Sequence, residues 1–302
     1  MAAVKAVLIA GPTASGKSAL AVDLAKRFGG RVINADSQQI YREWHVLTAR
    51  PSAEEEAAAP HLLYGHVSLT ETYSVGHWLT EIGPILDGPL PVIVGGTGLY
   101  FKALTEGLAP IPPVPDDVRA AGEAELARIG LTRFAEELSA QDPDTVAGLD
   151  MANPRRVLRA WEVLTATGTG LAEWKTRTPA PLLPLQDVAP IALTPPRDWL
   201  YARCNARFDQ MIANGALDEA REVAAMDAPP ASPGLRAVGA SPLFDHLADR
   251  LSLEDAAQKA KMDTRRYAKR QMTWLRNQMG AWRALDPTDA GAIETAIAMI
   301  EA

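Results

Sequence analysis

The sequence predicts an α/β protein in which a parallel sheet carries helices on both faces, with an all-helical domain inserted into the core. Three observations predict this fold. Apolar runs alternate with helical patterns over the first hundred residues, as in proteins built on parallel sheets. The proline-rich stretch LAPIPPVPDD at 108–117 then interrupts the alternation, and helical patterns alone follow to about Lys175. Finally, an apolar run at 191–193 returns the chain to the sheet.

The spacing of apolar residues gives the elements in order. Residues 4–10 form the first expected strand, and a helix follows that ends at Gly29 and Gly30. Further buried strands are expected at 32–36, 91–96 and 191–193, and later helices at 197–214 and 253–280, with a loop at 229–242. The predicted domains are a core at 1–112 and 186–302, and a helical insertion at 113–185.

Composition restricts the class of protein. The chain has 302 residues, 47% of them hydrophobic and 22% charged, and contains no run of about 18 apolar residues that would span a membrane. Its N-terminal apolar stretch is too short for a signal peptide, so a cytoplasmic protein is expected, with a monomer as the default. Cys204 is the single cysteine, which excludes an intramolecular disulfide and a cysteine-based zinc site. The net charge of −7 argues against a globally basic nucleic-acid binder.

A phosphate-binding loop follows the first strand. GPTASGKS fits the pattern G-x-x-x-x-G-K-[ST] and stands between a strand and a helix, which makes the core P-loop NTPase-like. Backbone N–H groups and the helix start can bind a diphosphate, Lys17 adds a charge, and Ser18 can offer an oxygen to Mg²⁺. By pattern alone the loop suggests ATP. The predicted phosphate-binding residues are Gly11, Pro12, Thr13, Ala14, Ser15, Gly16, Lys17 and Ser18.

Two further strands end in residues suited to chemistry. Asp36 follows the second strand at the edge where open α/β sheets bind ligands, and it fits a general base, a magnesium ligand or the N-cap of a following helix. The strand at 91–96 ends in Gly-Gly-Thr-Gly, which brings backbone close to a ligand and points the Thr97 hydroxyl toward the same edge. Because this strand does not end in Asp, an ATP-hydrolysing motor is disfavoured.

Six motifs in order carry a family resemblance: GPTASGKS, INADSQQIYR, VGGTGLYFKAL, NPRRVLRA, ARFDQMI and TRRYAKRQMTWLR. Together they resemble the tRNA dimethylallyltransferases, the MiaA or IPP transferase family. The resemblance implies transfer of a dimethylallyl group from dimethylallyl diphosphate to N6 of the adenosine immediately 3′ of the anticodon (position 37), in tRNAs that read codons beginning with U. Mg²⁺ would be the cofactor, and the phosphate loop would hold the leaving group.

The resemblance also implies roles for individual residues. Asp36 matches the proposed base, while Lys17, Thr97 and Arg207 would stabilise the departing diphosphate. Gln39 lies in a segment that contacts the extruded base, where an amide suits an adenine edge. The residues expected to contact tRNA are Asp36, Ser37, Gln38, Gln39, Thr97, Arg119, Arg155, Arg156, Val157, Leu158 and Arg159.

Basic patches reconcile an RNA substrate with the acidic charge. Asn153 and Pro154 predict a helix start that exposes the arginines at 155, 156 and 159. On the helix at 253–280, Arg265 and Lys269 lie on a basic half, opposite a half that suits the core. The basic half suits contacts with the phosphate backbone of RNA, and Arg265 and Lys269 are expected to make such contacts. The full set of basic residues on this half is Lys259, Lys261, Arg265, Arg266, Lys269, Arg270 and Arg276.

Three alternatives remain open. They are a small-molecule P-loop kinase, an isopentenyltransferase of free adenine nucleotides such as AMP, and a non-catalytic RNA-binding protein. The segment RAVGASPL at 236–243 departs from the family pattern, and we assign it no role. The same holds for His61, His66 and His77, since loop histidines are more often structural than catalytic.

Overall fold

The computed structural model describes residues 4–301 and divides the chain into two compact units. One unit comprises the described residues up to Thr105 together with those from Leu182 onward, and the other is Glu106–Pro181. The sequence prediction set the limits of the insertion at 113 and 185. Residues 1–3 and 302 of the predicted core lie outside the described residues.

The larger unit is built on a six-stranded sheet in which every paired strand is parallel. The order is β3-β2-β4-β1-β5-β6, with the first strand in the middle. The bounds are Ala6–Ala10 for β1, Arg31–Asn34 for β2, His61–Leu62 for β3, Pro91–Gly95 for β4, Val188–Leu193 for β5 and Arg283–Leu285 for β6. The predicted parallel sheet is confirmed, and the two edge strands β3 and β6 are those that the sequence did not reveal.

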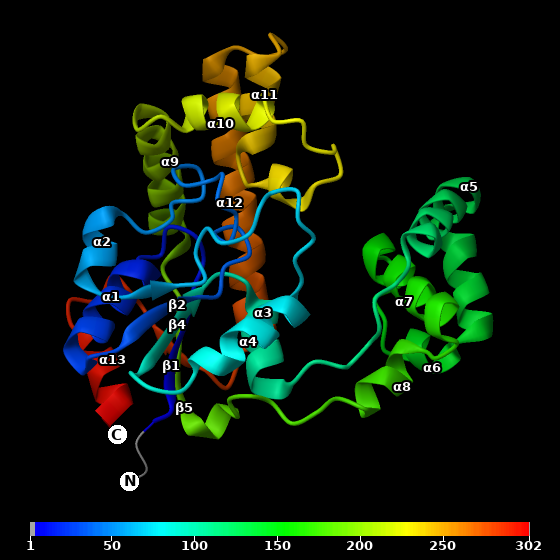
Figure 1. The fold of residues 1–302 in the computed structure, drawn as a ribbon, viewed down its shortest axis with the longest axis horizontal. Helices are drawn as coiled ribbons and strands as arrows, with labels where there is room; N and C mark the ends of the chain where they lie inside the picture. Colours follow the sequence, from blue (N-terminus) through cyan, green and yellow to red (C-terminus); the bar gives the residue numbers. More distant parts are fainter. Residues whose placement is uncertain (1–3, 302) are drawn as a thin grey trace. The chain divides into compact units, whose positions relative to one another are not determined.

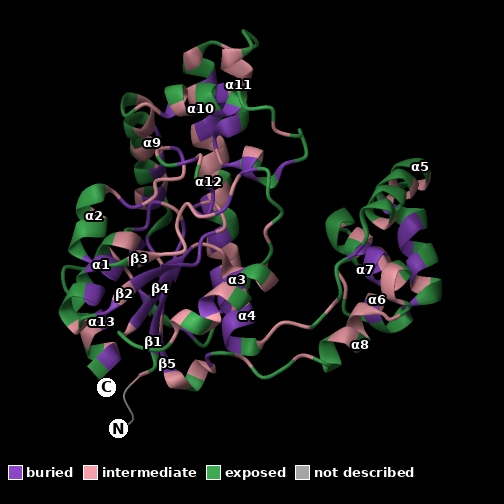
Figure 2. Ribbon diagram, viewed as in Figure 1, coloured by how far each residue is buried: buried purple, intermediate pink, exposed green. Residues whose placement is uncertain are grey.

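Helices cover both faces of the sheet, as Figures 1 and 2 show. Ala6, Leu8 and Ala10 of β1 point into one apolar layer, whereas Val7 and Ile9 point into the other. The first layer is covered by α3 (Val75–Ile82), α4 (Gly98–Glu106) and part of α12 (Leu253–Gln278), and the second by α1 (Lys17–Phe28) and α13 (Ala292–Glu301). A strand buried on both faces explains why β1 is a continuous apolar run.

A helical lobe continues from the sheet. It consists of α9 (Arg197–Ala213), α10 (Ala216–Ala224), α11 (Ala240–Leu247) and the first half of α12, which surround an apolar cluster that includes Trp44 and Phe208. The helices predicted at 197–214 and 253–280 are confirmed to within two residues at their ends. The region 229–242, predicted as a loop, contains the short helix η3 (Pro233–Arg236) and the start of α11.

The smaller unit is all-helical. It contains α5 (Asp116–Gln141), which is kinked at Gly130 where φ is +78°, then α6 (Pro143–Ala147), α7 (Pro154–Thr167) and α8 (Leu171–Thr176). Phe134, Leu138 and Val157 form its buried core. The predicted start of α7 is confirmed, because Arg156 N donates to the Asn153 side chain at 3.3 Å and a proline occupies the first turn.

The chain leaves and re-enters the larger unit at neighbouring points. Leu183 N donates to Leu104 O at 3.1 Å, although 78 residues separate them in the chain (183 − 105). Three short helices complete the larger unit: α2 (Ala53–Ala58) and the 3-10 helices η1 (Gly83–Ile85) and η2 (Leu185–Asp187). Across residues 4–301, every helix is too short or too polar to cross a membrane.

Candidate functional site

The phosphate loop, residues 11–18, joins β1 to α1 at the carboxyl edge of the sheet. Gly16 has φ +89° and is exposed, and this left-handed conformation, which glycine adopts without strain, turns the loop into α1 at Lys17. The loop and one side of α9 enclose a cavity of about 300 Å³. We call it the phosphate cavity; its walls are residues 14–19 with Arg203, Ala206, Arg207 and Gln210.

Lys17 is a buried cation in the phosphate cavity. Its Nζ donates to Pro12 O at 3.4 Å. The pKa of Lys17 is lowered to about 8, chiefly by burial; the Asp36 carboxylate acts in the opposite direction, and the Arg207 guanidinium contributes to the lowering. An ammonium held this way gains much from an anionic ligand, because the ligand would replace the water that burial removed.

A second, smaller cavity of about 50 Å³ adjoins Asp36. We call it the apolar cavity. Thr13, Asp36 and Gln38 form part of its polar side, and its apolar residues are Leu47, Phe208, Met211, Val238 and the ring of Tyr267. Arg207 borders both cavities, since it lines each of them from α9. Arg207 is half-buried, and burial lowers the pKa of its guanidinium while Asp36 raises it.

Asp36 is buried and held from several sides. Its N–H donates to Asn34 Oδ1 at 2.8 Å, and its Oδ1 accepts the Gln38 N–H at 3.0 Å. No helix begins between β2 and α2, so the interpretation of Asp36 as a helix N-cap is wrong; the carboxylate caps a turn instead. Within residues 4–301, Oδ2 accepts no hydrogen bond, and it is the carboxylate oxygen left for a ligand.

The Thr97 hydroxyl is engaged with the segment that follows Asp36. Ser37 N donates to Thr97 Oγ1 at 2.9 Å, and Thr97 Oγ1 donates to Ser37 Oγ at 3.1 Å. Asp36 and Lys17 each line a cavity that Arg207 also lines, whereas Thr97 lines neither cavity and bonds Ser37 instead. In the geometry observed, Thr97 supports the turn at Asp36.

Gln39 does not point its amide nitrogen at a ligand. Its Nε2 donates to Thr48 O at 3.0 Å and to Ala49 O at 2.6 Å, which uses both amide hydrogens. Reading an adenine edge by a donor and an acceptor together would require one of those hydrogens. The structure thus corrects the adenine-reading interpretation of Gln39, which instead holds the loop at 44–50.

The same loop is held from its other side by a carboxylate. Glu219 of α10 accepts hydrogen bonds from three successive backbone N–H groups, those of His45, Val46 and Leu47, the last two at 2.9 and 2.8 Å. Leu47 and Thr48 of this loop line the apolar cavity. Sequence reasoning missed Glu219, because nothing in the chain around it marks a residue that acts on a loop 170 positions earlier.

The divergent segment at 236–243 also reaches the site. Val238 N donates to Gln38 Oε1 at 3.2 Å, and the Val238 side chain lines the apolar cavity. Gln38 is half-buried, and its carbonyl is engaged by this contact. A segment to which the sequence assigned no role therefore forms one wall of the cavity beside Asp36.

The basic half of α12 is not uniformly free. Lys261 is only 13% exposed and pairs with Asp209 of α9 at 2.6 Å, while Arg265 donates to Asn205. Lys259 pairs with Asp245, and Arg266 lies 3.7 Å from Asp263. The expectation that this half as a whole is a phosphate-binding surface is therefore corrected. Lys259 and Arg266 are exposed although paired, and among the described residues the exposed cations of this half that form no ion pair are Lys269, Arg270 and Arg276.

The predicted tRNA-contacting residues of the insertion lie in the smaller unit. Arg119 is exposed on α5, and the arginines at 155, 156 and 159 are exposed on the first turns of α7. Three of them also form ion pairs at the surface, Arg119 with Asp116, Arg156 with Asp150 and Arg159 with Glu162. Val157 is fully buried and Leu158 packs against the same core. The side chains that α7 offers to a phosphate are its arginines, because those of Val157 and Leu158 form the core beneath them.

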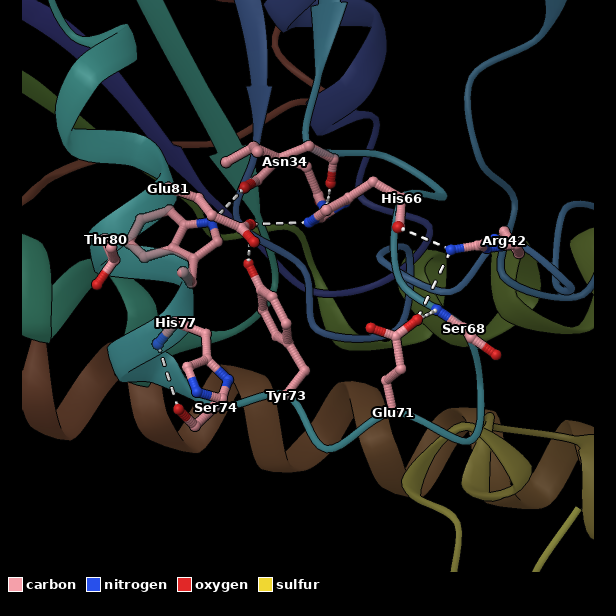
Figure 3. A network of polar contacts seen from close by, with 12 residues as sticks. Asn34, Arg42, His66, Ser68, Glu71, Tyr73, Ser74, His77, Thr80 and Glu81 are labelled. Atoms are coloured by element: carbon pink, nitrogen blue, oxygen red, sulfur yellow. Dashed lines mark hydrogen bonds and ion pairs between the residues drawn. The ribbon is translucent and has the colours of Figure 1, made fainter. Parts of the chain in front are cut away.

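His66, in the loop before α3, has a structural contact; His61 lies in β3 and His77 in α3. Figure 3 shows Glu81 accepting a hydrogen bond from the Tyr73 hydroxyl at 2.6 Å, with His66 Nε2 also 2.8 Å from its carboxylate. Burial and Glu81 raise the pKa of Tyr73. In the same network Trp78 Nε1 donates to Asn34 O at 2.8 Å, and Asn34 in turn holds Asp36. Through Asn34, this network supports the backbone at Asp36, although its other members line neither cavity.

A metal ion at the phosphate cavity would take most of its oxygen ligands from a bound diphosphate. Among residues 4–301 no three His, Cys, Asp or Glu side chains cluster as a metal site. Ser18, half-buried in the first turn of α1, offers one hydroxyl at the phosphate cavity. A cation there would take its remaining ligands from a bound diphosphate and water. Such an all-oxygen, water-rich set suits Mg²⁺, so the residues present fit that ion.

Comparison with family models gives two matches. Residues 39–278 match the model described as IPP transferase. Residues 4–63 match the model described as Isopentenyl transferase.

Curated relatives cover nearly the whole chain. A tRNA dimethylallyltransferase of Cereibacter sphaeroides is 55% identical over 280 residues, which span 92% of this chain and 88% of the relative. A tRNA dimethylallyltransferase of Dinoroseobacter shibae is 53% identical over 285 residues, which span 94% of this chain and 95% of the relative.

Solved structures agree in fold. The tRNA isopentenylpyrophosphate transferase of Bacillus halodurans superposes with a TM-score of 0.70 at 34% identity, covering 98% of this chain and 94% of that one. A eukaryotic dimethylallyltransferase, described as acting on tRNA, superposes with a TM-score of 0.81 at 27% identity, covering 97% and 76%.

Proposed function

Because the chain belongs to the tRNA dimethylallyltransferase (IPP transferase) family, we propose that it transfers a dimethylallyl group from dimethylallyl diphosphate to N6 of adenosine 37, the nucleotide 3′ of the anticodon. The substrates are tRNAs that read codons beginning with U. Diphosphate is the second product. One observation carries this proposal: a cavity suited to phosphate and an apolar cavity beside a buried carboxylate meet at Arg207.

The two cavities match the two halves of the donor. The diphosphate would lie over the phosphate loop, where backbone N–H groups and Lys17 face it, and the five-carbon group would extend into the apolar cavity. This arrangement puts the bond to be broken beside Arg207, since that residue borders both cavities. The guanidinium and Lys17 then face the charge that develops on the leaving diphosphate.

Asp36 serves the acceptor. The adenine N6 forms the new bond to the first carbon of the dimethylallyl group as the carbon–oxygen bond to diphosphate breaks, and the bonding electrons leave with the diphosphate. N6 must lose one proton in this exchange, and Asp36 Oδ2 would accept it, since the Gln38 N–H occupies Oδ1. The target base has to leave its stack to reach the cavity.

Mg²⁺ would be held by Ser18 Oγ together with diphosphate oxygens. When bound, the ion supplies neutralisation of diphosphate charge. Lys17 and the loop N–H groups keep the diphosphate in place, and the loop clamped by Gln39 and Glu219 closes the apolar side.

The tRNA would be gripped by exposed cations. Arg119, Arg155, Arg156 and Arg159 of the smaller unit are suited to backbone phosphates, as are Lys269, Arg270 and Arg276 of α12. Arg265, which donates to Asn205 of α9, would join them. We propose that the protein acts as a monomer. The buried free Cys204 is compatible with the reducing cytoplasm.

The test uses labelled dimethylallyl diphosphate and Mg²⁺, with unmodified tRNA in one reaction and AMP or ATP in another. We expect label in tRNA at adenosine 37 and none in the nucleotide. Label in AMP alone would contradict the proposal and favour a nucleotide isopentenyltransferase. Transfer of phosphate from ATP to a small molecule, without any label in tRNA, would favour a kinase.

A further inference from the structure

Gln271 of α12 is buried although its neighbours Lys269 and Arg270 are exposed. Its Oε1 accepts the Thr13 N–H at 2.8 Å, and its Nε2 donates to Gly96 O at 3.0 Å. Thr13 belongs to the phosphate loop, and Gly96 belongs to the loop that follows β4. One amide side chain therefore joins two loops that are 258 and 175 residues away from it in the chain.

The loop after β4 is shaped to receive α12. A Cβ atom at Gly96 would lie 2.0 Å from Gln271 Nε2, and one at Gly98 would lie 2.0 Å from Trp274 Nε1. Gln271 and Trp274 are three residues apart and share one face of the helix. These glycines thus admit side chains of α12. The sequence had suggested that the glycines of this loop bring backbone close to a ligand.

The two bonds reach the reacting groups through short connections. Gly96 precedes Thr97, whose hydroxyl bonds Ser37, and a Cβ at Gly96 would also lie 3.1 Å from Asp36 Oδ2. Thr13 lines the apolar cavity and stands next to the residues that wall the phosphate cavity. The Gln271 amide therefore helps to fix the distance between the phosphate loop and Asp36.

We propose that Gln271 is a positioning residue that sets the phosphate loop against the Gly96–Thr97 loop and so orients the donor diphosphate toward Asp36. An amide is required because one group must accept from Thr13 and donate to Gly96 at once. A carboxylate can accept but not donate, and a thioether of similar length does neither effectively. The kinetic part of this inference rests on the proposed function.

The test compares the full-length protein with Gln271→Met, which keeps the side-chain length, and Gln271→Glu, which keeps the acceptor alone. Gln258→Met is the matched control, because Gln258 is an exposed glutamine on the same helix. The measurements are calorimetric binding of inorganic diphosphate with Mg²⁺, the KM for dimethylallyl diphosphate, the Kd for tRNA and the unfolding temperature.

For Gln271→Met we expect diphosphate affinity and kcat/KM for the donor to fall about tenfold each, as the loss of two hydrogen bonds predicts. Gln271→Glu should lose more, because its charge approaches both Asp36 and the diphosphate. The Kd for tRNA should stay within about twofold, and Gln258→Met should match the wild type. A merely structural role would lower the unfolding temperature and leave diphosphate affinity at low temperature unchanged.

Unchanged diphosphate affinity in Gln271→Met would overturn the inference while leaving the proposed function intact. If Gln271→Met does not fold, wild-type affinity in Gln271→Glu would overturn it equally. If the wild type does not prenylate tRNA, the proposed function fails, and the calorimetric comparison still decides whether Gln271 sets the phosphate loop.

Discussion

The two cavities differ in how the chain builds them. The loop side of the phosphate cavity comes from one continuous stretch, residues 14–19, and its main groups are backbone N–H groups and one lysine. The walls of the apolar cavity come from six separate parts of the chain, and long-range contacts such as those of Glu219 and Gln38 hold several of them. The groups that face the diphosphate thus come mostly from one local motif, which distant residues such as Gln271 and Arg207 complete, whereas the apolar cavity has no local motif at its centre.

The sharpest test of this difference is Asp36→Asn. The amide oxygen of Asn can still accept the Gln38 N–H, so the turn is kept while the base is lost. We expect kcat to fall by about 10²–10⁴, the range for a general base. Diphosphate binding and the Kd for tRNA should change little. Equal loss of tRNA binding would mean that Asp36 acts in the fold and not in the chemistry.

The corresponding test of the phosphate cavity is Lys17→Met combined with a pH series. Removal of the ammonium should weaken diphosphate binding by roughly 10–100-fold, the value of a charged hydrogen bond. In the wild type, the pKa of about 8 means that Lys17 is charged below pH 8 and neutral above it. Because the anion needs the charged form, affinity should fall as pH rises through 8, by at most about tenfold per unit.

Calorimetry in two buffers of different ionisation enthalpy measures the protons taken up on diphosphate binding, and so checks the predicted direction of the pH dependence. Binding above pH 8 should take up a proton in the wild type. Lys17→Met serves as its control, since it retains the titration of diphosphate itself. If wild type and variant show the same proton uptake, Lys17 is not the group that titrates.

Glu219→Gln tests the apolar cavity, because Glu219 holds the loop that lines it. The variant keeps one acceptor oxygen for three N–H groups and loses the charge that strengthens those bonds. We expect kcat/KM for tRNA to fall about tenfold, with diphosphate affinity unchanged because no wall of the phosphate cavity moves. Glu222→Gln on the same helix, exposed to solvent, is the control. A parallel loss of diphosphate affinity would show that the cavities are not independently built.

The smallest expected effect separates two lysines of α12. Lys269 is exposed, whereas Lys261 is engaged with Asp209. Lys269→Ala should weaken tRNA binding by less than about tenfold and reduce the slope of log Kd against log salt by about one. Lys261→Ala should leave that slope unchanged. The reverse result would mean that the ion pair with Asp209 opens when RNA binds.

Much of the fold was predictable from the sequence, for identifiable reasons. Strands buried on both faces are continuous apolar runs, and caps such as Asn153 act within three residues. The edge strands β3 and β6 have two and three residues, too few to show a pattern. The residues of the site likewise differ in whether the sequence could reveal their role. Lys17 and Ser18 belong to a local motif, but the partners of Gln39, Lys261 and Glu219 lie on other elements, so no local pattern reveals whether each side chain is free.

The neighbouring exit and return of the chain at Leu104 and Leu183 have a consequence for protein engineering. Because one hydrogen bond already ties the two ends together, a short turn between them closes the larger unit without stretching either connection. The helical unit is therefore a removable cassette. A chain shortened in this way retains every lining residue of both cavities, because all of them belong to the larger unit.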